Sequence, residues 1–263
     1  MTSKRVSPTK VTLARHTMPN PWDSLSEHFN GKKDLSQIDT DAADNILIAW
    51  PVIIEQINTH FTKQTIGILD YGCGAGAFCE KLRTLGYRKV VGMDNSAAMI
   101  QMAKINYGDH ARFVQGTAET PLSLAAVEVI TGIMVFQFIA DIERTLANLL
   151  PVLKPGGLLI FAVHNPDMVT AALKKEKLLF SDFESSEHPA HGLIHLGGIS
   201  IPIFIRTAKE YDALLYQLGM TKVLESYPPF TKEFLAQYTP DVPDVPEYLI
   251  LGYRKNRSSN IVP

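Results

Sequence analysis

The chain has 263 residues, of which 46% are apolar and 20% charged, and its formal net charge is −2 at pH 7. This balance predicts a large folded domain and excludes a disordered chain, and without a basic surplus we expect no nucleic-acid partner. With only Cys73 and Cys79, the sequence excludes a disulfide framework and a four-cysteine zinc site. No apolar run is long enough for a membrane span, so we expect a cytoplasmic protein with no membrane partner.

The first part of the chain, residues 1–45, is expected to form an N-terminal arm and cap. Before Leu25 it is polar and basic, which is typical of a solvated tail, although an organellar transit peptide shares this composition. An amphipathic helix is predicted over residues 39–58, where Pro51 marks either a kink or the start of the helix.

From residue 65 onward, short apolar runs alternate with amphipathic segments. Strands are predicted over residues 66–72, 88–94, 111–116, 127–136 and 158–164, and helices over residues 78–85, 96–107 and 141–153. Each strand that is followed by a helix implies a crossover, so the sheet is expected to be mostly parallel. Residues 46–165 are therefore predicted to form a ligand-binding core.

The alternation breaks after Asn165, and residues 166–206 are predicted to be an inserted lid or substrate segment. This segment shows little periodicity before a strand predicted over residues 200–206. A helix over 208–219 and two strands over 220–227 and 247–255 follow. Residues 207–263 are thus expected to complete the core sheet.

The sharpest local signal lies in residues 68–78, where a buried strand runs into Gly72, Gly74 and Gly76 before a helix begins. Glycines let the backbone approach a ligand closely, and the start of a helix offers free N–H groups. The spacing also fits a dinucleotide fingerprint, so the glycines alone do not identify the ligand.

Two acids narrow the choice. Asp70 precedes the first glycine by two residues, where it would repel a pyrophosphate but attract an ammonium group. Asp94 ends the next strand, where an acid can accept hydrogen bonds from both hydroxyls of a ribose. S-adenosylmethionine carries an ammonium group and a ribose but no phosphate, and it fits both acids.

The order of motifs resembles that of the class I S-adenosylmethionine-dependent methyltransferases of the small-molecule type (types 11 and 25). The segments that carry the resemblance, within residues 66–164, are DYGCGAGAF, VVGMDNSAAMI, FVQGTAE, VEVITGIMVFQFIAD and LKPGGLLIFAV. The resemblance implies an α/β fold with a Rossmann-like, seven-stranded, doubly wound sheet, helices on both faces and an inserted lid. It also implies that the first five strands are parallel and the last is antiparallel.

The resemblance further implies S-adenosylmethionine as the cofactor. Thr117, Ala118 and Glu119 would lie near its adenine. The residues expected to bind it are Asp70, Gly72, Cys73, Gly74, Gly76, Asp94, Asn95, Met99, Thr117, Ala118, Glu119, Met134 and Gln137. Gln137 and Phe138 stand where histidines are common in the family, so no base is expected at either position.

Methyl transfer from a sulfonium depends mainly on orientation and exclusion of water, although a base helps when the acceptor carries a proton. His164 is the candidate catalytic residue because it ends the fifth predicted strand, near the cleft of such folds. The alternative is a histidine that closes the strand by bonding to backbone. Asn165 and Asp167 could orient the ring or start a turn.

The acceptor is expected to be a small, partly apolar molecule. The candidate substrate-binding residues are Trp22, Phe138, His188, His191 and His195. The three histidines, with Glu184 and Glu187, could also hold a metal, but their spacing matches no known metal motif, so no metal is predicted.

The predicted function is O- or N-methylation of a small molecule by in-line methyl transfer. Two alternatives remain from the sequence alone. One is a nicotinamide-dependent oxidoreductase, and the other is a repurposed fold that binds S-adenosylmethionine without transferring its methyl group. The sequence leaves the acceptor and the oligomeric state open.

Overall fold

The computed structural model describes residues 20–26, 29, 45–62, 64–175, 179–186 and 188–257, so most of the expected N-terminal arm lies outside the described residues. Seven strands form one sheet in the order β3-β2-β1-β4-β5-β10-β9. They are β1 (Gly67–Tyr71), β2 (Lys89–Asp94), β3 (Arg112–Gln115), β4 (Val127–Ile133), β5 (Leu153–His164), β9 (Met220–Ser226) and β10 (Tyr248–Lys255).

The directions of the strands confirm the predicted fold class. The pairs β1–β2, β2–β3, β1–β4 and β4–β5 are parallel, while β10 runs antiparallel to both β5 and β9. The strand order reverses between β1 and β4, since the chain leaves β1 toward β2 and returns to the other side of β1 as β4. Ligands of open α/β sheets bind in the crevice outside the carboxyl ends of the strands at such a reversal.

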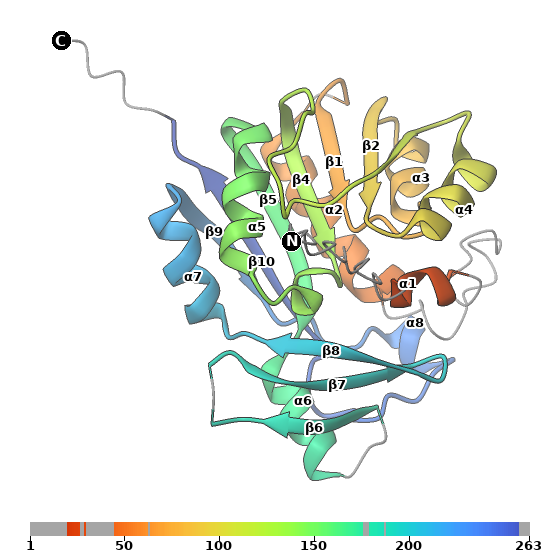
Figure 1. Cartoon of the computed structure of the whole chain (residues 1–263), viewed down its shortest axis with the longest axis vertical. Coiled ribbons are helices and arrows are strands. Elements are labelled where there is room, and N and C mark those ends of the chain that lie inside the picture. The colour runs from red at the N-terminus through yellow and green to blue at the C-terminus, as the bar shows by residue number, and fades with distance from the viewer. Residues whose placement is uncertain are drawn as a thin grey trace, which may run out of the picture.

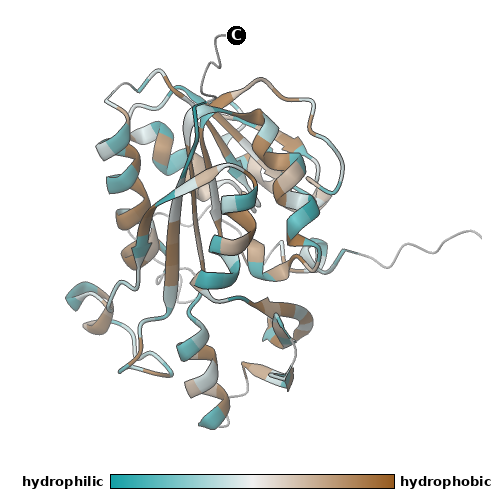
Figure 2. Cartoon of the chain, turned by 90° about the vertical axis from the view of Figure 1, so that its left-hand side faces the viewer, coloured by the Kyte–Doolittle hydropathy of each residue, from teal (hydrophilic) through white to brown (hydrophobic). Residues whose placement is uncertain are grey.

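Helices cover both faces of this sheet. α2 (Trp50–His60), α3 (Ala77–Thr84) and α4 (Ala97–Tyr107) pack on one face, and α5 (Ile142–Leu149) and α7 (Ala208–Gln217) on the other. Figure 2 shows the apolar strands between helices whose outer faces are hydrophilic. Because both faces are buried, the strands carry continuous apolar runs rather than alternation.

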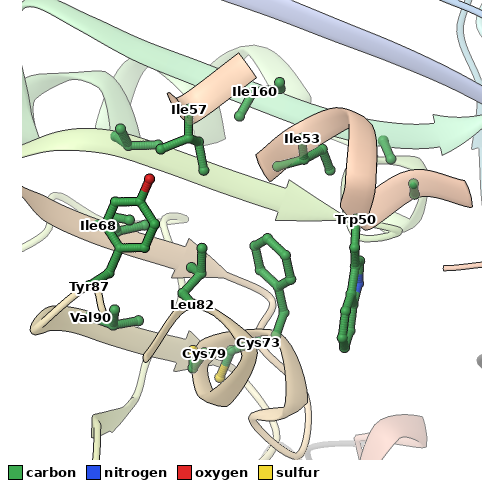
Figure 3. Packing of buried hydrophobic residues seen from close by; sticks show 14 of the residues in the cluster. Trp50, Ile53, Ile57, Ile68, Cys73, Cys79, Leu82, Tyr87, Val90 and Ile160 are labelled. Atoms are coloured by element: carbon green, nitrogen blue, oxygen red, sulfur yellow. The ribbon is translucent and has the colours of Figure 1, made fainter. Parts of the chain in front are cut away.

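The packing of α2 illustrates how one face of the core forms (Figure 3). Ile53 and Ile57 lie one turn apart on the helix and point toward Ile68 of β1 and Ile160 of β5. All four side chains are fully buried. Burial of one such side chain contributes roughly 1.5–3 kcal/mol, so this face anchors the strand that leads into the glycine loop.

A second, three-stranded antiparallel sheet forms within residues 166–206. After α6 (Pro166–Lys174) the chain builds β6 (Phe180–Glu184), β7 (Ala190–Leu196) and β8 (Ile199–Ile205) in that spatial order. Figure 1 shows this sheet, with α6, beyond the same lower end of the large sheet as the short helix α1 (Pro21–Ser24). The other short helix is α8 (Lys232–Leu235).

Three predicted boundaries change in the structure. The strand predicted over residues 127–136 ends at Ile133, because Met134 adopts a left-handed backbone with φ of 56° and turns the chain into a 3₁₀ turn, Phe136–Phe138. The helix predicted to residue 153 ends as α5 at Leu149, followed by a second 3₁₀ turn, Leu150–Val152. β5 then begins at Leu153, where Leu153 pairs with Val127 before a shift in register.

The helix predicted over residues 39–58 is described from Asn45 onward. It opens as a π-helical turn, Asn45–Ala49, and continues as α2. Pro51 lies in the first turn of α2, where its missing N–H is not needed. Within the described residues, no helix combines the length and the apolar character needed to cross a bilayer.

Arg206 fastens the small sheet to the large one. It lies between β8 and α7, is 4% exposed, and donates hydrogen bonds from its guanidinium to three backbone carbonyls, with distances of 3.4, 2.9 and 2.9 Å to Phe136, Ile139 and Ala140. These carbonyls belong to the segment that follows β4. A buried guanidinium held by carbonyls fixes this segment against the end of β8.

Replacement of Arg206 by methionine should therefore lower the free energy of unfolding by about 2–4 kcal/mol, because three buried carbonyls lose a charged donor. Urea denaturation of the wild type and Arg206→Met measures this difference. Arg206→Lys serves as the control and should recover only part of the loss, since an ammonium cannot reproduce the planar fork of donors. If Arg206→Met were as stable as the wild type, the three hydrogen bonds of Arg206 would contribute nothing to the free energy of unfolding.

Candidate functional site

A cavity of about 840 Å³ opens at the carboxyl ends of β1 and β4. This volume lies in the upper part of the roughly 300–1,000 Å³ range of ligand sites. The glycine loop after β1 forms one part of its lining, and residues from the small sheet and from α1 form another. The cavity therefore joins the loop that the sequence singles out with the inserted segment.

The glycine loop leaves space for a ligand. Gly72 has φ of +73°, and a Cβ there would meet the side chain of Val135 at 2.5 Å, so only glycine fits. Gly74 has φ of +52°, yet a Cβ there would meet no atom within 4 Å. The backbone at Gly74 thus faces open space inside the cavity, where a ligand can approach it. Gly76 is not among the described lining residues, and a Cβ there would meet the ring of Phe113 at 2.8 Å.

Asp94, at the end of β2, binds this loop from the side. Its carboxylate accepts hydrogen bonds of 2.9 Å each from the backbone N–H groups of Gly74 and Ser96. Burial raises the pKa of Asp94, although these bonds oppose the shift. The same carboxylate lines the cavity, so it is available to ligand hydroxyls next to the loop.

Asp70 is the acid beneath the loop, and it is 3% exposed. Thr131 donates a hydrogen bond of 2.7 Å to one of its oxygens, and the Cys79 thiol lies 3.5 Å from the other. Burial raises the pKa of Asp70 to about 6, against the lowering effect of these two donors, and Asp94 raises it further. A cationic ligand group would favour the ionised form of this carboxyl.

Most of the remaining residues expected at the cofactor line the cavity as well: Cys73, Asn95, Met99, Thr117, Glu119 and Met134. Two others lie outside the lining as far as the chain is described. Ala118 is fully buried, and its N–H donates to the Tyr71 hydroxyl at 3.1 Å. Gln137 is also buried, with its amide nitrogen 3.6 Å from the Met134 sulfur.

His164 ends β5 and faces the same cavity. The residue is 6% exposed, and its Nδ1 is buried without a hydrogen-bond partner. Burial lowers the pKa of His164 to about 4, so the ring is neutral at physiological pH. The ring of Phe180 meets it edge-on, with centroids 5.6 Å apart. A neutral imidazole with one unsatisfied nitrogen can bind a polar group of a ligand.

The segment around α1 covers part of the cavity. Trp22 lines it and meets the ring of Phe138 edge-on, with centroids 4.8 Å apart. Asp23 fixes this segment to the start of α4, where it accepts hydrogen bonds from the Ser96 hydroxyl at 2.6 Å and the Ala98 N–H at 3.2 Å. An acid at a helix N-terminus is favourable.

The three histidines of the inserted segment separate in space. His195 lines the cavity, and its two ring nitrogens lie 2.9 Å from the hydroxyls of Ser200 and Ser181. His188 has a side chain 83% exposed and faces Glu210, and His191 packs on the ring of Phe204. Neither is among the described residues that line the cavity.

Among the described residues, no three His, Cys, Asp or Glu side chains converge as metal ligands, while Glu187 lies outside the described residues.

Residues 69–161 match the family described as a methyltransferase domain. A ubiquinone biosynthesis O-methyltransferase of Mesorhizobium japonicum is 29% identical over 171 residues, or 60% of this chain and 68% of that protein. A protein of the same name from Chelativorans sp. is 36% identical over 102 residues and is matched over 40% of its length. A putative S-adenosylmethionine-dependent methyltransferase from Listeria monocytogenes has the same fold, with a TM-score of 0.63 at 20% identity, over 80% of this chain and 99% of that one.

These matches support a class I S-adenosylmethionine-dependent methyltransferase, with residues 69–161 as its methyltransferase domain. Its cofactor is S-adenosylmethionine, and the residues present fit that molecule. Asp70 offers a buried carboxylate for an ammonium group, Asp94 offers one for hydroxyls, and the open space at Gly74 admits the ligand beside the backbone. The match to a methyltransferase domain leaves the alternative of a nicotinamide-dependent oxidoreductase without support.

Other residues of the methyltransferase site are not apparent from the sequence. Leu179, Ile194 and Leu196 line the cavity from the inserted segment, and Glu247 lines it from just before β10. Alternation along β7 does not single out the residues that line the cavity, because the strand contributes lining residues from both of its faces. No pattern around Glu247 marks it, since it enters the site only through the pairing of β10 with β5.

The raised pKa of Asp70 makes cofactor affinity depend on pH. An ammonium group favours ionised Asp70, so binding must drive off a proton whenever the pH lies below the pKa of about 6. The affinity for S-adenosylhomocysteine, which keeps the ammonium, should be constant above about pH 7 and fall toward tenfold per pH unit below about pH 6. Calorimetric titrations across this range measure it.

The Asp70→Asn variant is the matched control, because it keeps the shape and removes the titrating charge. Its affinity should be lower at pH 7 and should lack the step near pH 6. A wild-type affinity that stays flat through pH 6 would show that Asp70 does not face the ammonium group.

Proposed function

We propose that this methyltransferase transfers the methyl group to a hydroxyl oxygen of a small, uncharged, largely apolar molecule, with His164 as the residue that orients the hydroxyl. The observation that carries the proposal is the buried Nδ1 of His164, which has no protein partner and belongs to a residue that lines the cavity. The nitrogen is closed off from the cavity in this conformation, and a rotation of the imidazole ring would turn it toward the acceptor. A ligand hydroxyl could then remove the desolvation cost of a buried polar atom without a partner.

The charges around the cavity support an uncharged acceptor. Arg144 is the only lysine or arginine among the described lining residues, and it is ion-paired with Asp141 at 3.2 Å. His164 is neutral because of its lowered pKa. A carboxylate or phosphate acceptor would therefore meet no unpaired cation, while Glu247 would repel it.

The apolar side chains support the rest of the proposal. Trp22, Phe138, Leu179 and Ile194 line the same cavity as the polar His164. Small-molecule sites combine a predominantly apolar wall with a few placed polar groups. The relatives named ubiquinone biosynthesis O-methyltransferases also act, by that name, on oxygen. Together these observations favour a hydroxyl on a largely apolar molecule over an amine.

The chemistry asks little of the protein beyond placement. S-adenosylmethionine, when bound, supplies a methyl group that is already activated by its sulfonium. His164 accepts a hydrogen bond from the acceptor hydroxyl through Nδ1 and so directs an oxygen lone pair at the methyl carbon. It takes the hydroxyl proton as the new carbon–oxygen bond replaces the carbon–sulfur bond, and S-adenosylhomocysteine leaves as a neutral thioether. Trp22 and Phe138 exclude water from the acceptor. Because its pKa is about 4, His164 orients the hydroxyl more than it removes the proton beforehand.

We also infer a small-molecule partner rather than a nucleic acid, and the cytoplasm as the location. The two free thiols, Cys73 and Cys79, support a reducing compartment. The inserted small sheet, with residues 20–26, acts as the lid of the acceptor space, since His195 and Trp22 line the cavity from these two segments.

His164→Ala should lower kcat about 10- to 100-fold, because the acceptor hydroxyl loses its orienting partner. Its affinity for S-adenosylhomocysteine should stay within about twofold of the wild type, because the alanine leaves the glycine loop, Asp70 and Asp94 in place. Steady-state turnover on catechol and calorimetric titration measure the two quantities.

His164→Gln is the companion variant, since its amide oxygen can still accept a hydrogen bond and should recover part of kcat. Full activity of His164→Ala would remove His164 from the reaction. A parallel loss of cofactor affinity would assign His164 to the cofactor instead of the acceptor.

A further inference from the structure

The face of β4 that packs under α2 and α3 carries a polar residue in an otherwise apolar row. Two positions to either side of Thr131, Val129 belongs to the apolar cluster beneath these helices and Ile133 packs against it. Thr131 itself is fully buried. A hydroxyl in such surroundings costs free energy unless a partner satisfies it, so the partner of Thr131 shows what the residue does.

The partner is Asp70 on the neighbouring strand. Asp70 and Thr131 are directly paired in the parallel register of β1 and β4, and the Thr131 hydroxyl donates a hydrogen bond of 2.7 Å to one carboxylate oxygen. The other oxygen lies 3.5 Å from the Cys79 sulfur, and a thiol is a weak donor. Thr131 is therefore the stronger of these two donors to the carboxyl group.

The groups around Asp70 make this hydrogen bond important. Asp70 lines the main cavity, yet burial and the carboxylate of Asp94 on β2 both disfavour its ionised form. The titratable groups on the helix side are thiols, Cys79 on α3 and Cys73 in the glycine loop, and neither supplies a cation. The buried side chains of α2 are apolar: Trp50, Ile53 and Ile57. Of the interactions that favour ionised Asp70, the hydrogen bond from Thr131 is the largest.

We infer that Thr131 is a positioning residue for cofactor binding, because its hydroxyl keeps the carboxyl group of Asp70 ionised and directed at the ammonium group of S-adenosylmethionine. Thr131 is not among the described residues that line the cavity, so it acts through Asp70. The inference goes beyond the proposed O-methylation, since it concerns the cofactor and holds for any acceptor.

Thr131→Val removes the donor and keeps nearly the same shape. The pKa of Asp70 is already about 6, and loss of the donor raises it further, so the ionised form is lost at a higher pH. The fall in affinity for S-adenosylhomocysteine should move up by about one to two pH units. Relative to the wild type, the affinity should be about three- to 20-fold lower near pH 6.5 and less than about twofold lower near pH 8.5.

Calorimetric titrations of both proteins across this pH range measure the difference. A loss of the same size at every pH, or no loss at all, would overturn the inference. Thr131→Ala removes the same donor and should give the same shift, which keeps the test independent of how valine packs.

Thr131→Ser is the matched control, because serine keeps a hydroxyl at the same position of β4. It should retain the wild-type dependence on pH. If Thr131→Ser instead behaved like Thr131→Val, the hydroxyl would not be the group that matters. Urea denaturation of all three variants verifies that each one folds.

A double variant tests whether Thr131 acts through Asp70. In an Asp70→Asn background there is no carboxyl group to keep ionised, so Thr131→Val should change the affinity for S-adenosylhomocysteine by less than about twofold. An equal loss in both backgrounds would show that Thr131 acts independently of Asp70, which contradicts the inference.

A ligand without the amino-acid end separates the inferred role from damage to the glycine loop. 5′-Methylthioadenosine keeps the adenine and the ribose but lacks the ammonium group. Its affinity should therefore be the same for the wild type and Thr131→Val across the pH range. A parallel loss for both ligands would assign Thr131 a structural role in the loop and overturn the inference.

Discussion

The cofactor end of this structure depends on one carboxylate that is almost completely removed from water. Asp70 lies on β1 and faces β4 and α3. Its hydrogen-bond donors are the Thr131 hydroxyl from β4 and the Cys79 thiol from α3. Two neutral donors compensate burial only in part, which explains why the pKa of Asp70 rises to about 6. A cationic ligand group would supply the missing compensation, and the same charge would disfavour a pyrophosphate at this place. The environment of Asp70 therefore discriminates between the candidate ligands more than the glycines do.

Much of the fold is readable from the sequence because buried parallel strands leave continuous apolar runs between amphipathic helices. The end of β4 is not, because nothing in the sequence marks the left-handed backbone at Met134. The small sheet is only partly readable. A shift in register within β6, with Asp182 at φ of 54°, obscures its alternation. Gly197 and Gly198 form the two-residue turn between β7 and β8, and this pair is a hairpin signal that the sequence does contain.

The two ends of the site differ in how far the sequence predicts them. The cofactor end is local, since the glycine loop and the ends of β1 and β2 supply its acids, and their spacing along the chain is informative. The acceptor end is assembled from segments distant in sequence, and residue type alone misleads there. Three histidines occur within eight residues, yet only His195 lines the cavity, while His188 faces solvent and His191 packs on a ring. Leu179 and Glu247 reach the cavity only through tertiary packing.

The most direct test of the central claim is a calorimetric titration of the purified chain with S-adenosylhomocysteine, S-adenosylmethionine and NADH at pH 7.5, where Asp70 is ionised. The structure predicts micromolar binding of the two adenosyl ligands and none of NADH, because the buried carboxylate attracts an ammonium group and repels a pyrophosphate. Binding of NADH together with no binding of S-adenosylhomocysteine would contradict the role assigned to Asp70 and the account built on it.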